Sequence, residues 1–127
     1  EVLREIVKDW FVSHFSPAQP LWIGRVLMRS LLDPTPSLRV VVEQIFEPDH
    51  DALRAIISRA RPDLSEEEAR LWAFTVTGQI AFYEFCRTPV LMILGQEQYD
   101  PAFLDGVAEH VASLVIAALG LPQAIHL

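Results

Sequence analysis

Proline and glycine divide this chain into segments whose apolar residues recur at helical spacing, and this punctuation limits the folds open to it. In the first segment Leu3, Val7, Trp10 and His14 share one helical stripe. No segment shows the sustained alternation of polar and apolar residues that is typical of a strand. We therefore expect an all-α fold, a bundle of about six helices, at residues 1–15, 21–33, 36–60, 65–86, 90–94 and 101–119.

Several predicted helix ends carry residues that stabilise free backbone groups. Ser65 and Glu68 form a capping box, in which the serine accepts the N–H three residues on and the glutamate reaches back. Asp100 can cap the last helix, while Gly95 and Gly120 can end the helices before them. These signals predict helix ends from local chemistry alone.

The third predicted helix contains a proline in its interior. We expect Thr35 to cap this helix, with Pro36 at its first position, where the missing N–H is harmless. Pro48 removes a hydrogen bond and crowds the preceding turn, so the helix should kink or end there. Asp49 or Asp51 would then restart it.

Composition and charge exclude several functions. The 127 residues fit one domain, and a hydrophobic fraction of 51% excludes disorder. The net charge is −7 and no lysine or arginine follows Arg87, so the chain lacks the basic patch of a nucleic-acid-binding face. The single cysteine, Cys86, cannot form an internal disulfide, which indicates an intracellular protein. The apolar stretches at 71–83 and 112–121 are shorter than the roughly 20 residues of a membrane span.

Two predicted helices are apolar around nearly their whole circumference, at 71–85 and 111–119. A surface helix of a monomer keeps one polar face, so these helices should be covered once by the core and once by something else. Their small residues would let two subunits pack closely as a four-helix bundle in a homodimer. The alternative is an ordinary monomer core. The residues expected at the dimer interface are Ala73, Thr77, Ala81, Gly106, Ser113 and Ala117.

No catalytic or metal-binding motif stands out. The histidines share no metal-ligand spacing, and the chain has no paired cysteines, no nucleophile elbow and no phosphate-binding loop. Glu47, Asp49, His50 and Asp51 could hold a divalent metal, but the consecutive residues point in different directions on a helix, which favours a helix restart with acidic capping. Cys86 is best interpreted as an inert, buried cysteine. We therefore expect no enzyme activity, no metal and no cofactor.

Aromatic and polar side chains lie on the interior stripes of several helices. A small-molecule pocket combines mostly apolar walls with a few placed polar groups. Buried Arg29 or Gln79 would need a partner, which a ligand can supply. The alternative is a packed core with internal hydrogen bonds. The expected ligand-binding residues are Trp10, His14, Trp22, Arg29, Phe46, Trp72, Thr75, Gln79 and Tyr83.

Four short segments occur in a characteristic order. They are LMRSLLDPTP at 27–36, TGQIAFY at 77–83, RTPV at 87–90 and YDP at 99–101. Together they resemble the C-terminal domain of TetR-family transcriptional repressors, in particular the CecR-like subgroup, and the resemblance spans residues 1 to about 120. One departure is Ser30, which stands where the subgroup has a glutamate.

The resemblance implies a function that composition does not show. The chain would dimerise and bind a small, largely apolar effector, while a preceding helix-turn-helix domain would bind operator DNA. Glu1 lies in mid-helix without a cap, which agrees with a missing N-terminal part. Effector binding would change the spacing of the two recognition helices and release the operator. This implies a bacterial, cytoplasmic repressor without membrane contact. The alternative is a helical protein–protein interaction module with no small-molecule ligand.

Overall fold

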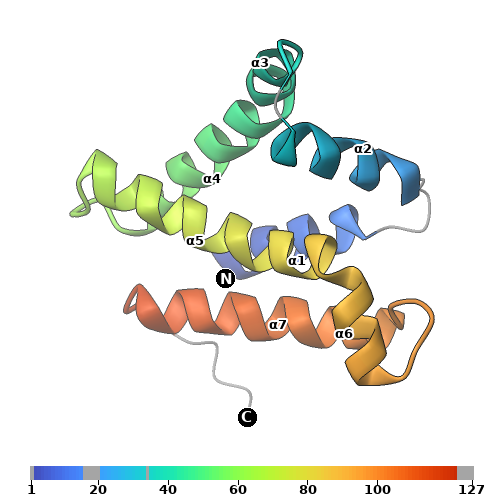
Figure 1. Ribbon diagram of the computed structural model, residues 1–127. Coiled ribbons are helices and arrows are strands. Elements are labelled where there is room, and N and C mark those ends of the chain that lie inside the picture. Colours follow the sequence, from blue (N-terminus) through green and yellow to red (C-terminus); the bar gives the residue numbers. More distant parts are fainter. Residues whose placement is uncertain (1, 16–20, 34, 123–127) are drawn as a thin grey trace.

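The structure is a computed structural model that describes residues 2–15, 21–33 and 35–122. Its elements are α1 (Val2–His14), α2 (Leu21–Leu32), α3 (Leu38–Val41), η1 (Val42–Phe46), α4 (Glu47–Ala60), α5 (Glu66–Phe85), α6 (Arg87–Leu94) and α7 (Pro101–Ala118). Since α3, the π-helical turn η1 and α4 follow one another without a break, these ranges hold six helices and no strand (Figure 1). The predicted all-α bundle is confirmed.

Helices α1, α5 and α7 form the centre of the bundle. α1 packs most extensively on α7, while α5 packs most extensively on α4 and also contacts α1 and α7. In Figure 1, α5 and α7 run side by side with α1 behind them, and α2 and α4 lie on the other side of α5. The short α6 leads the chain from α5 to α7. No described side chain of α2 belongs to the buried core, and this helix contacts α3.

The core consists of residues three or four apart on four helices. On α1 they are Leu3, Val7 and Phe11, and Phe11 is completely buried. Ala73 and Ala108 are also completely buried, and such small residues let helix axes approach closely. The other core residues are Leu53, Ile57, Ala69, Val76, Ile80, Val107, Val111, Ala112, Val115, Ile116 and Leu119.

The helix ends that local chemistry predicts are present. Ser65 has an extended backbone, and its Oγ accepts the N–H three residues on at 3.1 Å, at the start of α5. Asp100 Oδ1 accepts the N–H two residues on at 2.9 Å, at the start of α7. Gly95 and Gly120 have φ angles of 67° and 70°, in the left-handed region that ends helices. Helix α6 begins at Arg87, earlier than predicted.

The start of the third helix also differs from the prediction. Thr35 does not cap it, since the helix begins at Leu38 and its N-cap residue is Ser37. Ser37 has a helical backbone and makes no side-chain hydrogen bond to the helix. The Thr35 carbonyl instead accepts the Leu38 N–H at 2.9 Å. This turn already satisfies one of the free N–H groups that a side-chain cap would otherwise serve.

Of the two outcomes expected at Pro48, a kink or an end, the helix does not end, because it continues through the proline after a π-helical turn. In the π-helical turn η1 the Glu47 N–H bonds to the Val42 carbonyl five residues back. This turn shifts the hydrogen-bond register by one residue, so the ring of Pro48 and its missing N–H are accommodated without an interruption. Asp49 and Asp51, which we expected to restart the helix, lie within its regular course.

A buried arginine links α1 to α7. Arg4 is 8% exposed, and its Nη1 donates to Glu109 Oε1 and, at 2.9 Å, to Ser113 Oγ. Lys8 Nζ lies 3.1 Å from the second carboxylate oxygen of Glu109. The hydrogen bond from Lys8, helped by the charge of Arg4, holds the pKa of Glu109 below its usual value. The two helices are therefore joined by charge as well as by packing.

Glu109→Gln is expected to lower the free energy of unfolding by about 1 kcal/mol at neutral pH, because buried Arg4 loses its charged partner while Glu109 itself is partly exposed. Since folding lowers the pKa of Glu109, its stabilisation is present above the ordinary glutamate pKa and is lost as the pH falls through the folded-state value. Urea unfolding of both proteins between about pH 7 and pH 3 measures this. A difference that stays constant with pH would contradict the pairing.

Helix α7 is long and apolar enough to cross a membrane, judged by length and composition alone. Its buried residues, however, pack on α1 and α5 inside the bundle. The core helix of a soluble protein passes the same test, so one such helix is weak evidence for a membrane span.

Candidate ligand-binding cavity

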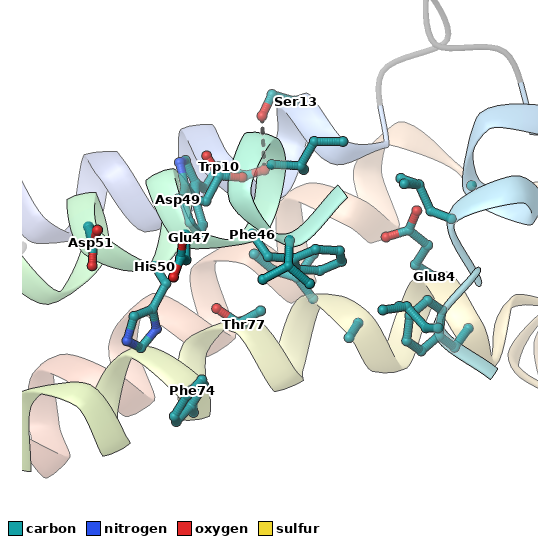
Figure 2. Close-up of a pocket in the computed structure, with 18 of the residues that line it drawn as sticks. Trp10, Ser13, Phe46, Glu47, Asp49, His50, Asp51, Phe74, Thr77 and Glu84 are labelled. Atoms are coloured by element: carbon teal, nitrogen blue, oxygen red, sulfur yellow. Dashed lines mark hydrogen bonds between the residues drawn. The ribbon is translucent and has the colours of Figure 1, made fainter. Parts of the chain in front are cut away.

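A large cavity lies on the side of α5 that faces α2 and α4. Its volume is about 720 Å³, and α1, α2, the η1–α4 segment and α5 all contribute to its wall. Figure 2 shows the lining side chains converging from these elements. The apolar and small lining residues are Trp10, Gly24, Leu27, Leu31, Val42, Ile45, Phe46, Phe74, Ile80, Ala81 and Phe85. Such a mostly apolar, aromatic wall is typical of small-molecule sites.

The π-helical turn shapes one wall of the cavity. Val42, Ile45 and Phe46 belong to η1, Glu47 and Asp49 follow in α4, and all five line the cavity. Because the turn holds one extra residue, it changes which side chains of the helix share a face. π-helical turns occur frequently at functional sites for this reason.

Polar lining side chains gather at two ends of the cavity. Figure 2 shows Glu84 of α5 at the end next to α2, and Glu47, Asp49 and His50 of α4 at the other end. The remaining polar lining residues are Ser13, Asp51, Arg70 and Thr77. The cavity thus offers charged groups at both ends of a mostly apolar space.

His50 is the lining residue whose hydrogen-bonding capacity is least satisfied. Its ring nitrogens Nδ1 and Nε2 are both buried, and neither has a hydrogen-bond partner within the described ranges. The ring stacks on Phe74 with the two centroids 4.6 Å apart. A buried polar atom without a partner is costly. Protein atoms cover both nitrogens, so a molecule in the cavity would reach them only after the ring moves.

Two of the predicted ligand-binding residues, Trp10 and Phe46, line the cavity. Arg29 does not, because it lies on the exposed side of α2, opposite the residues of that helix that face the cavity. The side chains of His14 and Trp22 lie outside the described part of the structure.

The four predicted ligand-binding residues of α5 lie on other faces of that helix. Trp72 is half-buried against the core, Thr75 is exposed and Gln79 is half-buried. Tyr83 packs on Phe11, with ring centroids 5.7 Å apart. The residues that α5 does contribute to the cavity are Arg70, Phe74, Thr77, Ile80, Ala81, Glu84 and Phe85.

Tyr83 is held away from the cavity by a second, smaller core between α5, α6 and α7. Its backbone carbonyl accepts a hydrogen bond from the Tyr99 hydroxyl. Tyr99 stacks on Phe103 at 5.8 Å, and the Arg87 guanidinium lies 5.0 Å from the Tyr99 ring centroid. Burial raises the pKa of Tyr99. These contacts explain why Tyr83, the last residue of the TGQIAFY segment, belongs to the packing of the bundle.

The residues predicted for a dimer interface are found in several environments. Thr77 and Ala81 line the cavity, and Ala73 is completely buried in the chain's own core. Ser113 is half-buried and bonded to Arg4. On α5, therefore, two of the three residues expected at the dimer interface line the cavity, while the residues expected in the cavity lie elsewhere.

Helices α5 and α7 also carry exposed apolar residues. On α5, Leu71 and Phe82 are 61% and 51% exposed, and on α7 Leu114 is 50% exposed. Gly106 and Ala117, two of the predicted interface residues, are exposed on α7 as well. The sequence predicts that these two helices are covered by something besides the core. Such a partner would pack on this exposed surface.

The sequence of the chain matches a known family over nearly its whole length. Residues 1–120 match the family described as the C-terminal domain of the HTH-type transcriptional dual regulator CecR. The chain belongs to this family. The resemblance to the C-terminal domain of TetR-family regulators, drawn from the four segments, is thereby confirmed. Comparisons with curated proteins and with solved structures gave no match.

A CecR-type C-terminal domain is a regulatory domain of a transcription factor, a class that in general binds ligands and dimerises. The family is one of transcriptional regulators and not of enzymes. Within the ranges that the structure describes, no group of three or more histidine, cysteine or carboxylate side chains could hold a metal ion.

Proposed function

We propose that this domain binds a small, largely apolar effector in its cavity and controls, as a homodimer, a helix-turn-helix domain that precedes it. The observation that carries this proposal is the cavity itself. Its volume of about 720 Å³ falls within the roughly 300–1,000 Å³ of small-molecule pockets. The whole protein would be a cytoplasmic bacterial repressor. The effector would favour a dimer geometry in which the two recognition helices no longer fit the operator.

Helix α1 offers a physical route from the cavity to such a DNA-binding domain. Trp10 and Ser13 line the cavity near one end of α1. Arg4 near the other end and Lys8 at the middle of the helix bind Glu109 of α7. An effector that moves α1 at the cavity would therefore act on the helix nearest to a preceding domain and on the packing between α1 and α7.

The exposed apolar residues of α5 and α7 support a dimer built from these two helices. Two helices from each subunit would form a four-helix bundle about a two-fold axis. Leu71, Phe82 and Leu114 would be buried there, next to Gly106 and Ala117 of the original prediction. Large exposed apolar surfaces are uncommon on monomers, so a second copy of the chain is a fitting cover.

Ala81→Trp is expected to weaken binding of a neutral apolar molecule at least about tenfold, because the indole ring would occupy space in the cavity. A suitable probe is N-phenyl-1-naphthylamine, whose fluorescence rises in apolar surroundings. Titration of wild type and variant gives the two dissociation constants. Absence of saturable binding to the wild type would contradict the proposed function, and equal affinities would contradict this site.

The matched control is Ala102→Trp, which adds the same side chain at an exposed position in the first turn of α7, outside the cavity. Its affinity for the probe should equal that of the wild type. A similar loss in both variants would point to a general disturbance of the bundle, and circular dichroism of each variant checks for one.

A further inference from the structure

The cavity wall carries an excess of negative charge. Four carboxylates line it, from Glu47, Asp49, Asp51 and Glu84, against the single guanidinium of Arg70. Within the described ranges only Asp51 has an ionic partner, Arg54, and that pair is 3.7 Å apart. Glu47 and Asp51 are exposed, whereas Asp49 and Glu84 are half-buried and have no ionic partner among the described residues.

Glu84 is the carboxylate best placed to act on a ligand. It is half-buried on α5 at the end of the cavity next to α2 (Figure 2). Its Oε1 lies 3.1 Å from the position that a Cβ would occupy on Gly24 of α2, so the absence of a side chain there leaves room for the carboxylate between the two helices. A ligand that displaces the remaining water from such a carboxylate binds better if it brings an opposite charge, because a desolvated, unpaired carboxylate is costly.

The cavity that Glu84 lines also contains aromatic rings. Trp10, Phe46, Phe74 and Phe85 all line the cavity. The faces of aromatic rings attract cations, most strongly when water is excluded.

We propose that the cavity selects organic cations, molecules with an apolar or aromatic body and a positively charged nitrogen or equivalent centre, and that Glu84 pairs with this charge. The inference rests on the proposed function, because it specifies the chemical class of the effector in the same cavity. It also differs from the sequence-based prediction, in which Arg29 or Gln79 would bind the polar end of the ligand.

A pair of probes of nearly equal size and opposite charge tests this inference. Tetraphenylphosphonium and tetraphenylborate share the same four rings and differ in the sign of their charge. Titration calorimetry of the wild-type chain should show at least tenfold tighter binding of the phosphonium. Equal binding of the two ions, tighter binding of the borate, or binding of neither would overturn the inference.

Two variants that remove the same charge separate the role of Glu84 from that of the net charge. Glu84→Gln should weaken phosphonium binding about tenfold and leave the affinity for neutral N-phenyl-1-naphthylamine unchanged. Glu97→Gln, on the exposed loop before α7 and outside the cavity, should change neither affinity. Equal phosphonium affinities in both variants would exclude Glu84 as the selecting group.

The neutral probe also distinguishes this inference from the proposed function. If the neutral probe binds and is blocked by Ala81→Trp, but the phosphonium is not preferred, the cavity remains a ligand site and only the cationic class is excluded. If the wild-type chain binds neither the neutral probe nor the phosphonium, both proposals fail together.

Discussion

Leu114→Glu is expected to convert the proposed homodimer to monomers, raising the dimer dissociation constant by about 100-fold or more. Leu114 is 50% exposed on α7, where the proposed four-helix bundle would bury it. A two-fold axis places each interface residue in the assembly twice, so one substitution introduces two glutamates. An unpaired charge in a buried interface costs roughly 3–5 kcal/mol, and each 1.4 kcal/mol corresponds to tenfold in affinity. Light scattering after size exclusion, at several protein concentrations, measures the change.

The matched control for this prediction is Ile93→Glu. Ile93 is 85% exposed on α6, outside the proposed interface, so the same charge should leave the dimer intact. A Leu114→Glu variant that remains dimeric would show that α7 does not form the interface. A wild-type chain that is monomeric at all concentrations would remove the dimer from the proposal, while the cavity and its ligand tests would stand.

The sequence predicts the helices of this domain well because their ends depend on neighbouring residues. Ser65 and Asp100 accept backbone N–H groups only two or three residues away, and Gly95 and Gly120 adopt the left-handed backbone that other residues avoid. Nothing distant along the chain is needed for these interactions. The helix bounds therefore follow from the sequence to within a few residues.

The continuous helix through Pro48 could not be predicted in the same way. A proline in the interior of an α-helix kinks or breaks it, and on that basis we expected the helix to kink or end there. The π-helical turn from Val42 to Phe46 removes the conflict and also brings Ile45, Phe46 and Asp49 to the cavity. The sequence does not distinguish a helix that ends from one that continues after a π-helical turn. The same proline and the same apolar stripe are compatible with both.

The faces of α5 show a second limit of sequence analysis. A helix that is apolar all round contains several equivalent stripes, and its spacing alone does not say which stripe meets which neighbour. The stripe of Phe74, Thr77, Ala81 and Glu84 could have been found from its spacing. Its assignment to the cavity depends on where α2 and α4 pack, which is a tertiary property. Trp10 and Phe46 were found because they lie on helices with a single apolar face.

Phe11→Ala is expected to lower the free energy of unfolding by about 3–5 kcal/mol, the range observed when a buried phenylalanine is truncated. Phe11 is completely buried on α1, and its ring lies 5.3 Å from that of Phe15 and 5.7 Å from that of Tyr83. It therefore joins the main core to the smaller core around Tyr99. Because a domain is typically stable by only about 5–15 kcal/mol, this variant should be close to unfolding.

The neighbouring residue provides the control for this last prediction. Val12 is on the same helix but 46% exposed, so Val12→Ala should change stability by less than about 1 kcal/mol, with alanine's higher helix propensity offsetting part of the lost contact. Urea unfolding of both variants, at one fixed protein concentration so that dimerisation affects them equally, gives the comparison. Similar losses in the two variants would mean that α1 does not pack on the core through Phe11. The route from the cavity through α1 to a preceding domain would then lose its support as well.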